Sequence, residues 1–366
     1  MSPPSQRILI VRPSALGDVC RTVPALASLR AAYPQAVIDW VVRDAFVDAV
    51  RGHPAVNEII PFPRKRFARW WKSPNVALEA RRWFSAVRAR RYDLVFDLQG
   101  LTRSGLITGA TRAPRRVGWR SAREGAWLFY NRRHEGPTKR HIVDQMLELL
   151  EREQVKPILH DLRLYVPRDV EATWPDDRAV LGLDEKPYVV LAPTSRWVTK
   201  RWPADRWAAL VPALRQRGFE RFAIIGAPDE REQAAPFFDA VAALSEAAGE
   251  GVIDLVGRTS LAQTLAVIRD SSLVIAHDSA PLHMAVGFDR PSVGLFGPTD
   301  PEFVGPYGWE HGVVNALSPA ERQSINFRDK GLGDGVMRRI AVGQVLDRVE
   351  AVRRPRTLVA VERVES

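Results

Sequence analysis

The chain has 366 residues and a mass of 41.0 kDa, with 46% apolar and 26% charged residues, the balance of a soluble globular protein with room for two domains. The 53 Lys and Arg residues against 43 Asp and Glu give a net charge of +10, so an anionic partner is expected. The single cysteine, Cys20, excludes an intrachain disulfide and a Cys-x-x-Cys metal site, and it favours a reducing compartment, the cytoplasm.

The sequence shows neither a membrane-spanning helix nor a signal peptide. No stretch reaches the roughly 18 consecutive apolar residues of a membrane-spanning helix. The opening residues, MSPPSQR, contain no apolar core of a signal peptide. We therefore expect a protein that is neither exported by a signal peptide nor threaded through a bilayer.

In the first half, short runs rich in Val and Ile alternate with segments of helical period, a pattern typical of parallel sheets covered by helices. The predicted strands are Arg7–Arg12, Val37–Val42, Asn57–Ile60 and Asp93–Leu98. The predicted helices are Leu16–Tyr33, Val76–Arg90 and His141–Glu153. Residues 1–165 are expected to form the first domain.

A second cycle of the same pattern begins at Tyr188. Strands are predicted at Tyr188–Pro193, Phe222–Gly226, Val252–Gly257, Leu273–Asp278 and Val293–Gly297, and helices at Trp202–Gln216, Asp229–Glu246 and Leu261–Arg269. The polar segment Val166–Pro187, with three prolines, is expected to be the linker. The second domain is expected over residues 188–330, followed by a helix and tail over 331–366. The predicted fold class is α/β, with two Rossmann-like doubly wound domains facing a central cleft.

Positive charge is concentrated in the first domain. Residues 60–140 hold 20 Lys and Arg against 5 Asp and Glu, a net charge of +15 where the whole chain has +10. Tryptophans, among them Trp70, Trp71, Trp83, Trp119 and Trp127, are interleaved with these cations. The segment suits nucleic acid, a phosphorylated lipid surface or a phosphorylated sugar, although for any single arginine a solvated basic face is the simpler interpretation.

The first predicted strand is followed by a turn, Ser14-Ala15-Leu16-Gly17-Asp18, that opens a helix. In a doubly wound sheet ligands bind at the carboxyl ends of the strands, so Asp18 is expected in the cleft. A carboxylate there acts as a general base or stabilises the helix N-terminus, and the spacing alone favours the structural role. No Gly-x-Gly-x-x-Gly or Walker A sequence follows a predicted strand, which argues against an ordinary NAD site.

Polar residues also follow strands of the second half. Thr194 and Ser195 end one strand and Lys200 comes shortly after them, a set that suits phosphate oxygens. After the next strand, Asp229 is placed either to hold the hydroxyls of a ribose or simply to cap a helix.

The run from Asp278 to His283 is the most informative. Backbone amides of a helix that starts near Ser279, with its hydroxyl, are expected to form a metal-free diphosphate site. His283 lies in the first turn or so of that helix and faces either the phosphates or the core.

Five short segments occur in one order: S-x-x-G-D from Ser14, D-L-Q-G from Asp97, T-S-x(4)-K-R-W-P from Thr194, D-S-x(3)-H from Asp278 and G-P-T-D-P from Gly297. Together they resemble the ADP-heptose lipopolysaccharide heptosyltransferases, glycosyltransferase family 9, which have the GT-B fold. The resemblance spans about residues 7–312. The segment Trp119–His134 is similar to the members that add the first heptose to Kdo.

The resemblance implies inverting transfer of heptose from ADP-L-glycero-D-manno-heptose to the Kdo of the lipopolysaccharide inner core, with no cofactor and no metal. Asp18 would be the general base, and the first domain would hold the acceptor. The implied donor-binding residues are Thr194, Ser195, Lys200, Glu230 on the ribose, Asp278, Ser279 and His283; the implied acceptor-binding residues are Ser14, Gly17, Gln99, Arg120 and Arg123.

The implied partners are the ADP-heptose donor, Kdo-bearing lipid A and the anionic inner face of the inner membrane, where a cytoplasmic enzyme would bind peripherally; no nucleic acid is expected. One departure bears on the identity of the sugar, because Ala280 stands where the family commonly has Gly.

Two alternatives stay open. One is transfer of another nucleotide-linked sugar to a phosphorylated glycan. The other is a non-catalytic protein that binds nucleic acid or an anionic membrane through residues 60–140. Such a binder would have no need for Asp18 together with Lys200 and a diphosphate turn at matching strand ends, and this favours the enzyme.

Overall fold

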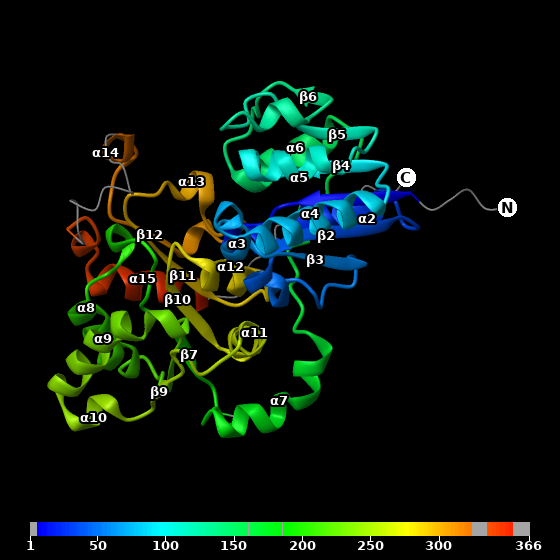
Figure 1. The fold of residues 1–366 in the computed structure, drawn as a ribbon. Helices are drawn as coiled ribbons and strands as arrows, with labels where there is room; N and C mark the ends of the chain where they lie inside the picture. The colour runs from blue at the N-terminus through cyan, green and yellow to red at the C-terminus, as the bar shows by residue number, and fades with distance from the viewer. Residues whose placement is uncertain (1–5, 160, 185, 324–334, 354–366) are drawn as a thin grey trace.

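The computed structural model describes residues 6–159, 161–184, 186–323 and 335–353. Two parallel sheets of six strands each, one in each half of the chain, are covered by helices. Figure 1 shows the two halves side by side, the first in blue to green and the second in green to red. The expected α/β class with two doubly wound units is confirmed.

The first half contains strands β1 to β6. Their bounds are Arg7–Val11, Val37–Arg43, Glu58–Phe62, Leu94–Asp97, Arg115–Trp119 and Arg132–His134. The helices are α1 (Leu16–Cys20), α2 (Val23–Ala32), α3 (Arg64–Phe67), α4 (Pro74–Ala89), α5 (Thr102–Ala110) and α6 (Ile142–Glu151), with 3₁₀ turns η1 (Asp44–Ala49), η2 (Trp70–Lys72) and η3 (Ala126–Phe129).

The second half contains strands β7 to β12. Their bounds are Val189–Ala192, Phe222–Ile224, Val252–Asp254, Leu273–His277, Ser292–Phe296 and Val313–Asn315. The helices are α8 (Ala204–Arg215), α9 (Arg231–Leu244), α10 (Glu246–Gly249), α11 (Leu261–Asp270), α12 (Ala280–Gly287), α13 (Pro301–Val304), α14 (Pro319–Gln323) and α15 (Val342–Arg353), with 3₁₀ turns η4 (Val198–Lys200), η5 (Pro228–Glu230), η6 (Glu310–Gly312) and η8 (Met337–Arg339).

The two sheets have the same strand order. The first runs β3-β2-β1-β4-β5-β6, and the second runs β12-β11-β10-β7-β8-β9, which is the same order counted from β7. In each sheet the order reverses next to the first strand, between β1 and β4 and between β7 and β10. Ligands of open α/β sheets bind at such switch points, so the loops after these four strands are where a site is expected.

The predicted helix Leu16–Tyr33 is wrong in one respect, because it is two helices with a break at Arg21 and Thr22. Pro24 lies in the first turn of α2. Proline has no N–H and its ring would clash with the carbonyl four residues earlier, so the helix cannot run through it unbroken. The break lets Arg21 leave the helical path of α1.

The predicted linker contains a helix, α7 (Arg168–Val180). Trp174 of this helix is buried and its Nε1–H donates to Asp270 Oδ2 of the second half at 2.6 Å. Asp169 pairs with Arg51 of the first half at 2.6 Å. The segment is therefore fastened to both halves. Of the expected C-terminal helix and tail, the helix is α15, and residues 331–334 and 354–366 lie outside the described residues.

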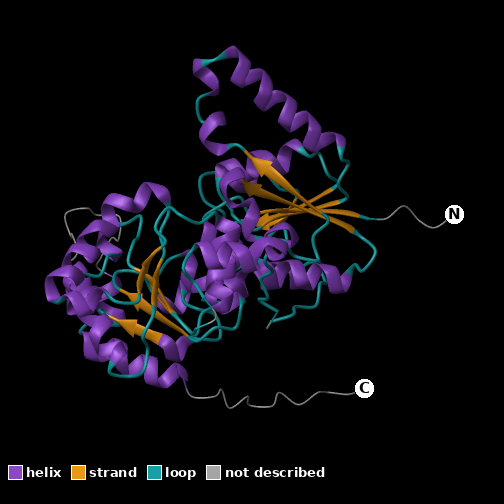
Figure 2. Ribbon diagram, turned by 90° about the horizontal axis from the view of Figure 1, so that it is seen from below, coloured by secondary structure: helices purple, strands orange, loops and turns teal. Residues whose placement is uncertain are grey.

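One apolar cluster joins the two halves. It contains buried residues of the first sheet, such as Ile8 and Phe96, and of the second, such as Val190 and Leu282. Figure 2 shows both sheets edge-on with helices packed between them. Every helix in the described part of the chain is too short or too polar to pass through a bilayer.

Candidate active site

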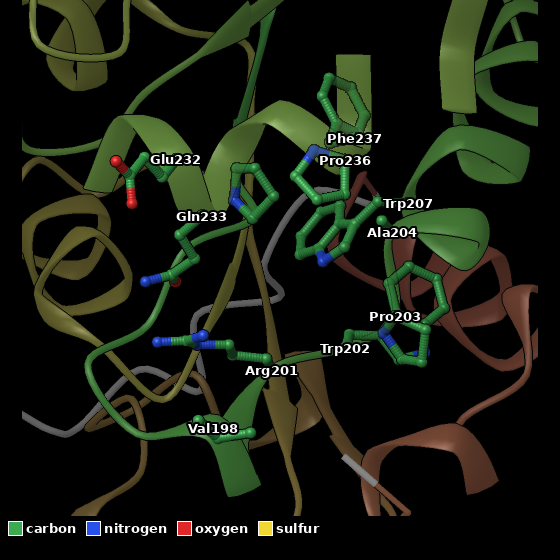
Figure 3. Close-up of a pocket in the computed structure, with 11 residues that line it drawn as sticks. Val198, Arg201, Trp202, Pro203, Ala204, Trp207, Glu232, Gln233, Pro236 and Phe237 are labelled. Atoms are coloured by element: carbon green, nitrogen blue, oxygen red, sulfur yellow. The ribbon is translucent and has the colours of Figure 1, made fainter. Parts of the chain in front are cut away.

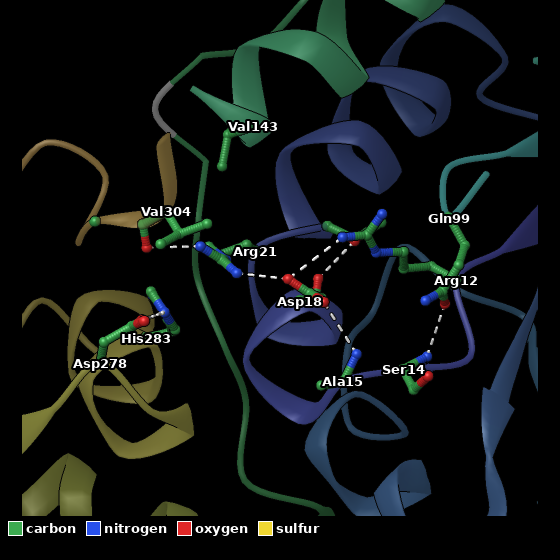
Figure 4. Close-up of polar contacts among 12 residues, drawn as sticks. Arg12, Ser14, Ala15, Asp18, Arg21, Gln99, Val143, Asp278, His283 and Val304 are labelled. Carbon is green, nitrogen blue, oxygen red and sulfur yellow. Dashed lines mark hydrogen bonds and ion pairs between the residues drawn. The ribbon is translucent and has the colours of Figure 1, made fainter. Parts of the chain in front are cut away.

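Asp18 lies in α1, directly after the switch-point strand β1, and both of its oxygens have partners (Figure 4). Oδ2 accepts the Ala15 backbone N–H at 3.0 Å. Oδ1 pairs with Arg21 Nη2 at 2.5 Å and with Arg12 Nη2 at 3.3 Å. The contact with Ala15 confirms that Asp18 stabilises the start of the helix. The side chain is still one quarter exposed, so a ligand can reach it.

The charges around Asp18 fix its ionisation. Burial works to raise the pKa of Asp18, but the Arg12 and Arg21 guanidiniums and the Ala15 N–H outweigh burial and hold it well below its ordinary value. The Arg12 guanidinium also donates to the carbonyl of Leu98, at the end of β4. The carboxylate is therefore charged at any pH at which the protein works.

The turn after β4 lies beside Asp18 and is held by a buried carboxylate. Asp97 Oδ1 accepts the N–H groups of Gln99 and Gly100, both at 2.9 Å, and Oδ2 accepts the Tyr130 hydroxyl at 2.6 Å. Gln99 Oε1 accepts the Ser14 N–H at 3.0 Å. The turns after β1 and β4, which contain the predicted acceptor residues Ser14 and Gln99, are thus linked by a hydrogen bond, and the third such residue, Gly17, lies in α1. Sequence reasoning missed the role of Tyr130, because it lies far from Asp97 along the chain.

The predicted donor residues gather at the other switch point, after β7 and β10. Lys200 Nζ lies 2.5 Å from Asp278 Oδ2, and both side chains are nearly buried. His283 Nε2 lies 3.9 Å from Asp278 Oδ1. Burial, and then the Arg21 charge, lower the pKa of His283 to about 3, so its imidazole is neutral. Its Nδ1 is buried and has no hydrogen-bond partner in the described part of the chain, which is typical of a group that awaits a ligand.

Two further predicted residues, Thr194 after β7 and Glu230 after β8, contact each other. Thr194 Oγ1 donates to Glu230 Oε2 at 2.8 Å. The same Glu230 oxygen also accepts the Ala227 N–H at 2.9 Å. Glu230 is at the N-cap position of α9, so the interpretation of Asp229 as the cap of this helix is wrong: Asp229 lies within the 3₁₀ turn η5 that precedes α9. The pairing keeps the Glu230 carboxylate at the strand end where a ribose is expected.

Ser279 is the N-cap of α12, but its side chain caps no backbone N–H. Its hydroxyl lies 3.3 Å from the carbonyl of His277. In the first turn Pro281 has no N–H, and the Leu282 N–H donates to the Ser279 carbonyl at 3.2 Å. The amides that remain without a capping side chain are those of Ala280 and His283, at the helix N-terminus where an anion would bind.

The two switch points meet where α1 packs on α12. A Cβ atom added to Gly17 would lie 2.8 Å from His283 Cδ2 and 3.6 Å from the Cα of Ala280. Only glycine allows this approach without a shift of either helix. The candidate base Asp18 is the next residue, so it lies beside the donor cluster of the other half.

Several polar contacts join the halves around this point, and sequence reasoning missed all of them. Arg21 Nη1 donates to the carbonyl of Val304 at 2.6 Å. His141 Nε2 lies 3.2 Å from the Gly305 carbonyl, and Tyr307 donates to Asp144 at 2.5 Å. Arg140 pairs with Asp300 at 2.6 Å and with Glu302 at 2.9 Å. The G-P-T-D-P sequence marks this segment as a motif. Nothing in the sequence, however, indicates which residues of the first half the segment contacts.

The two predicted acceptor arginines lie differently. The Arg123 N–H donates to the carbonyl of Gly100 at 3.0 Å, so Arg123 adjoins the turn beside Asp18, and its side chain is exposed. Arg120 follows β5 and pairs with Glu135 at 3.3 Å, with both side chains largely exposed. The structure brings the backbone of Arg123 to the turn beside Asp18, whereas Arg120 pairs with Glu135 on the surface.

A separate pocket of about 490 Å³ lies between the N-terminal ends of α8 and α9 (Figure 3). Trp202, Trp207 and Phe237 form its apolar wall, with Arg201 and Gln233 beside them. Arg201 Nε donates to the Ser195 carbonyl at 2.9 Å, and Gln233 Oε1 accepts the Ser195 N–H at 2.5 Å. None of the predicted donor residues lines this pocket, but its residues hold the backbone of Ser195.

Within the described residues, no three His, Cys, Asp or Glu side chains form a group that could hold a metal ion. The charged and titratable groups described for the site are two arginines, a lysine, a histidine and carboxylates.

Comparison with known proteins adds three findings. The model of glycosyltransferase family 9 (heptosyltransferase) matches residues 80–330. Lipopolysaccharide heptosyltransferase 1 of Pseudomonas aeruginosa is 33% identical over 307 residues, which cover 82% of this chain and 81% of that protein. Two solved structures of the Escherichia coli heptosyltransferase WaaC are also similar. The structure with ADP has a TM-score of 0.74 and 28% identity, and the match covers 95% of this chain and 100% of that chain. The structure with ADP-2-deoxy-2-fluoro heptose has a TM-score of 0.69 and 27% identity, and the match covers 94% and 99% of the two chains.

Proposed function

The chain belongs to glycosyltransferase family 9, the heptosyltransferases, and on that premise we propose that it moves heptose from ADP-L-glycero-D-manno-heptose to the Kdo of the lipopolysaccharide inner core. Its sequence similarity to heptosyltransferase 1 supports the first transfer rather than a later one. The observation that carries the proposal is the meeting of Asp18 with the Lys200, Asp278 and His283 cluster where α1 packs on α12.

Asp18 would act as the general base. The acceptor oxygen forms a bond to the anomeric carbon of heptose, the bond from that carbon to the diphosphate breaks, and the acceptor proton passes to the Asp18 carboxylate. The two guanidiniums make Asp18 a weak base. A weak base suffices when the hydroxyl has become acidic through partial bond formation, so we place the proton transfer late. No covalent intermediate is needed.

The donor cluster would stabilise the departing ADP. Negative charge grows on the diphosphate as the sugar leaves, and the Lys200 ammonium, the uncapped amides of α12 and the Ser279 hydroxyl lie at that strand end. Groups fixed in place before the reaction stabilise such charge at little cost in reorganisation. Glu230 and Thr194 would hold the ribose.

The acceptor would bind to the first half of the chain. Arg123 adjoins the Gly100 turn, and the +15 charge of residues 60–140 suits a phosphorylated glycolipid in an anionic leaflet. We propose that the enzyme works at the inner face of that membrane.

The test is a reaction of the purified chain with ADP-heptose and Kdo-bearing lipid A. We expect release of one ADP for each product, with the product heavier by one heptosyl residue. The same yield is expected in EDTA, because the proposed leaving-group stabilisation uses a lysine and helix amides. Transfer only from another nucleotide sugar would contradict the proposed donor, and transfer only to an acceptor that already carries heptose would contradict the proposed acceptor.

A further inference from the structure

The segment of residues 64–73, which we term the tryptophan loop, consists of α3, η2 and the residues around them. From residue 59 to residue 78 the chain contains five Lys and Arg and no Asp or Glu. One side chain fastens the loop: Phe67 is buried and contacts the rings of Phe62 and Trp83, with centroid distances of 5.8 and 6.2 Å. The loop therefore has a defined position, with its other side chains turned outward.

Two tryptophans of the loop face solvent. Trp70 is 58% exposed and Trp71 is 65% exposed, and their rings pack edge to face at 6.5 Å. By contrast, Trp40, Trp202 and Trp207 are fully buried. Leu78, on the following helix α4, is 45% exposed. Adjacent large apolar side chains that are held in water by a fixed turn are typical of an interaction site.

The cations around the pair are largely unneutralised. Arg66 pairs with Glu79 at 2.5 Å. No carboxylate of the described residues pairs with Lys65, Arg69 or Lys72, and all three are exposed. The loop thus presents two indole rings within a rim of positive charge, the composition that binds the interface of an anionic bilayer.

The position of the loop fits the same partner. Figure 2 shows α4 and the turns before it standing out from the first half at the top of the view. At the other end of the loop, burial and the charges of Arg103, Arg43 and Arg196 lower the pKa of Arg64. Arg196 belongs to the second half of the chain, so Arg64 lies near the junction of the two halves. One end of the loop therefore lies near this junction, and the other projects outward.

We propose that the tryptophan loop docks the enzyme on an anionic phospholipid bilayer, with Trp70 and Trp71 at the boundary of headgroups and acyl chains and Lys65, Arg69 and Lys72 on lipid phosphates. The projecting shape favours a broad surface over single-stranded nucleic acid, which binds aromatic side chains along a groove. The proposal rests on the proposed function only in supposing that the acceptor is anchored in that bilayer.

The experiment uses the full chain and vesicles without acceptor, either phosphatidylcholine alone or mixed with phosphatidylglycerol. Wild type should sediment with the mixed vesicles and much less with the neutral ones, and raised salt should weaken binding. The double variant Trp70→Ala/Trp71→Ala should bind mixed vesicles about tenfold more weakly or worse. The control Val180→Ala/Leu244→Ala removes side chains that are 80% and 50% exposed on α7 and α9, and it should bind like wild type.

A second measurement tests insertion directly. Brominated acyl chains should quench part of the tryptophan fluorescence of wild type, and the double variant should lose that quenching. Transfer to acceptor in detergent should be the same in the double variant and wild type, whereas transfer to acceptor in vesicles should fall.

Undiminished vesicle binding by the double variant would overturn the inference. So would tryptophan-dependent binding to a single-stranded oligonucleotide in preference to vesicles. The two proposals fail separately: an enzyme that transfers heptose but ignores the vesicles contradicts only the docking surface, and a protein that binds vesicles through the tryptophans but transfers no heptose contradicts only the proposed reaction.

Discussion

Asp18 has an observed structural role at the start of α1 and would combine it with the proposed role of general base. One carboxylate oxygen caps the start of α1 through Ala15, and the other faces the Arg12 and Arg21 guanidiniums. The position of Asp18 shortly after the first strand could be predicted from the sequence. Its charged partners could not, because Arg12 lies in the turn after that strand and Arg21 lies at the break between α1 and α2. The strength of the base is therefore set by residues that no local pattern marks as functional.

Arg21 gives the first prediction. Its guanidinium holds Asp18 and the Val304 carbonyl of the other half, so Arg21→Met removes a charge that keeps the pKa of Asp18 low. A raised pKa means that the base is protonated at a higher pH. We therefore expect the kcat/KM profile of Arg21→Met to show an acid limb at a pH where the wild-type profile is still flat.

The Arg21→Lys variant is the control, because it keeps the charge and should keep most of the wild-type profile. A loss of activity in Arg21→Met that is equal at every pH would show that Arg21 only stabilises the fold.

Among the helices and strands, the contact between α1 and α12 determines how closely Asp18, the proposed base, approaches the proposed donor-binding residues. Gly17→Ala places a methyl group 2.8 Å from His283 Cδ2, and His283 is buried, so its imidazole or one of the two helices must shift. Because displacements of about 1 Å can cost about 10²-fold in rate, we expect kcat to fall at least tenfold. ADP affinity should fall less, because His283 is one of several proposed donor-binding residues.

The matched control is Gly343→Ala on α15, where an added Cβ atom meets nothing within 4 Å. It should leave kcat unchanged. Equal rates for Gly17→Ala and wild type would mean that the two helices do not need this close approach during turnover.

Sequence patterns predicted the elements that are buried and regular. Strands β1, β2 and β4 are almost wholly buried, and their runs of Val, Ile and Leu are typical of parallel strands. Strands β5 and β6 were missed because they contain Arg115, Arg116, Arg132 and Arg133, which give no apolar run. The break before α2 could have been predicted from Pro24, but the period of the apolar residues outweighed it.

The candidate site was predictable where residues follow strands, and unpredictable where the two halves meet. Asp18, Thr194 and Asp278 each stand at the end of a strand that has a recognisable pattern. Arg21, His141 and Tyr307 contact residues more than 160 positions away. Such contacts depend on how two domains pack, which no local spacing encodes.

For the whole molecule, buried histidines predict loss of stability in mild acid. Burial lowers the pKa of His53 and of His277 to about 4, and that of His283 to about 3. Between these values and the ordinary 6.5 the unfolded chain binds protons that the folded chain does not. Stability therefore falls as pH drops from 6.5 towards 4, by up to about 1.4 kcal/mol per pH unit for each histidine.

Urea unfolding at pH 7.5, 6 and 5 measures this loss, followed by the fluorescence of the buried tryptophans. His53 lies beside Tyr165, away from the donor cluster, so His53→Gln removes one of the three groups without touching the site. The variant should show a shallower decline between pH 6 and 5. An unfolding midpoint independent of pH over this range would contradict the account.

The central claim is that Asp18 takes the acceptor proton during heptosyl transfer, and Asp18→Asn tests it most directly. The amide keeps the shape of the side chain but cannot accept the proton. In single-turnover reactions of ADP-heptose with Kdo-bearing lipid A, we expect the rate to fall about 10²-fold or more, with ADP affinity near wild type. The amide gives the Arg12 and Arg21 guanidiniums no charged partner, so the unfolding midpoint should also fall, and the rates are compared where both proteins are folded. Product formation at the wild-type rate by a folded Asp18→Asn enzyme would contradict the account and leave Asp18 as a residue that caps α1.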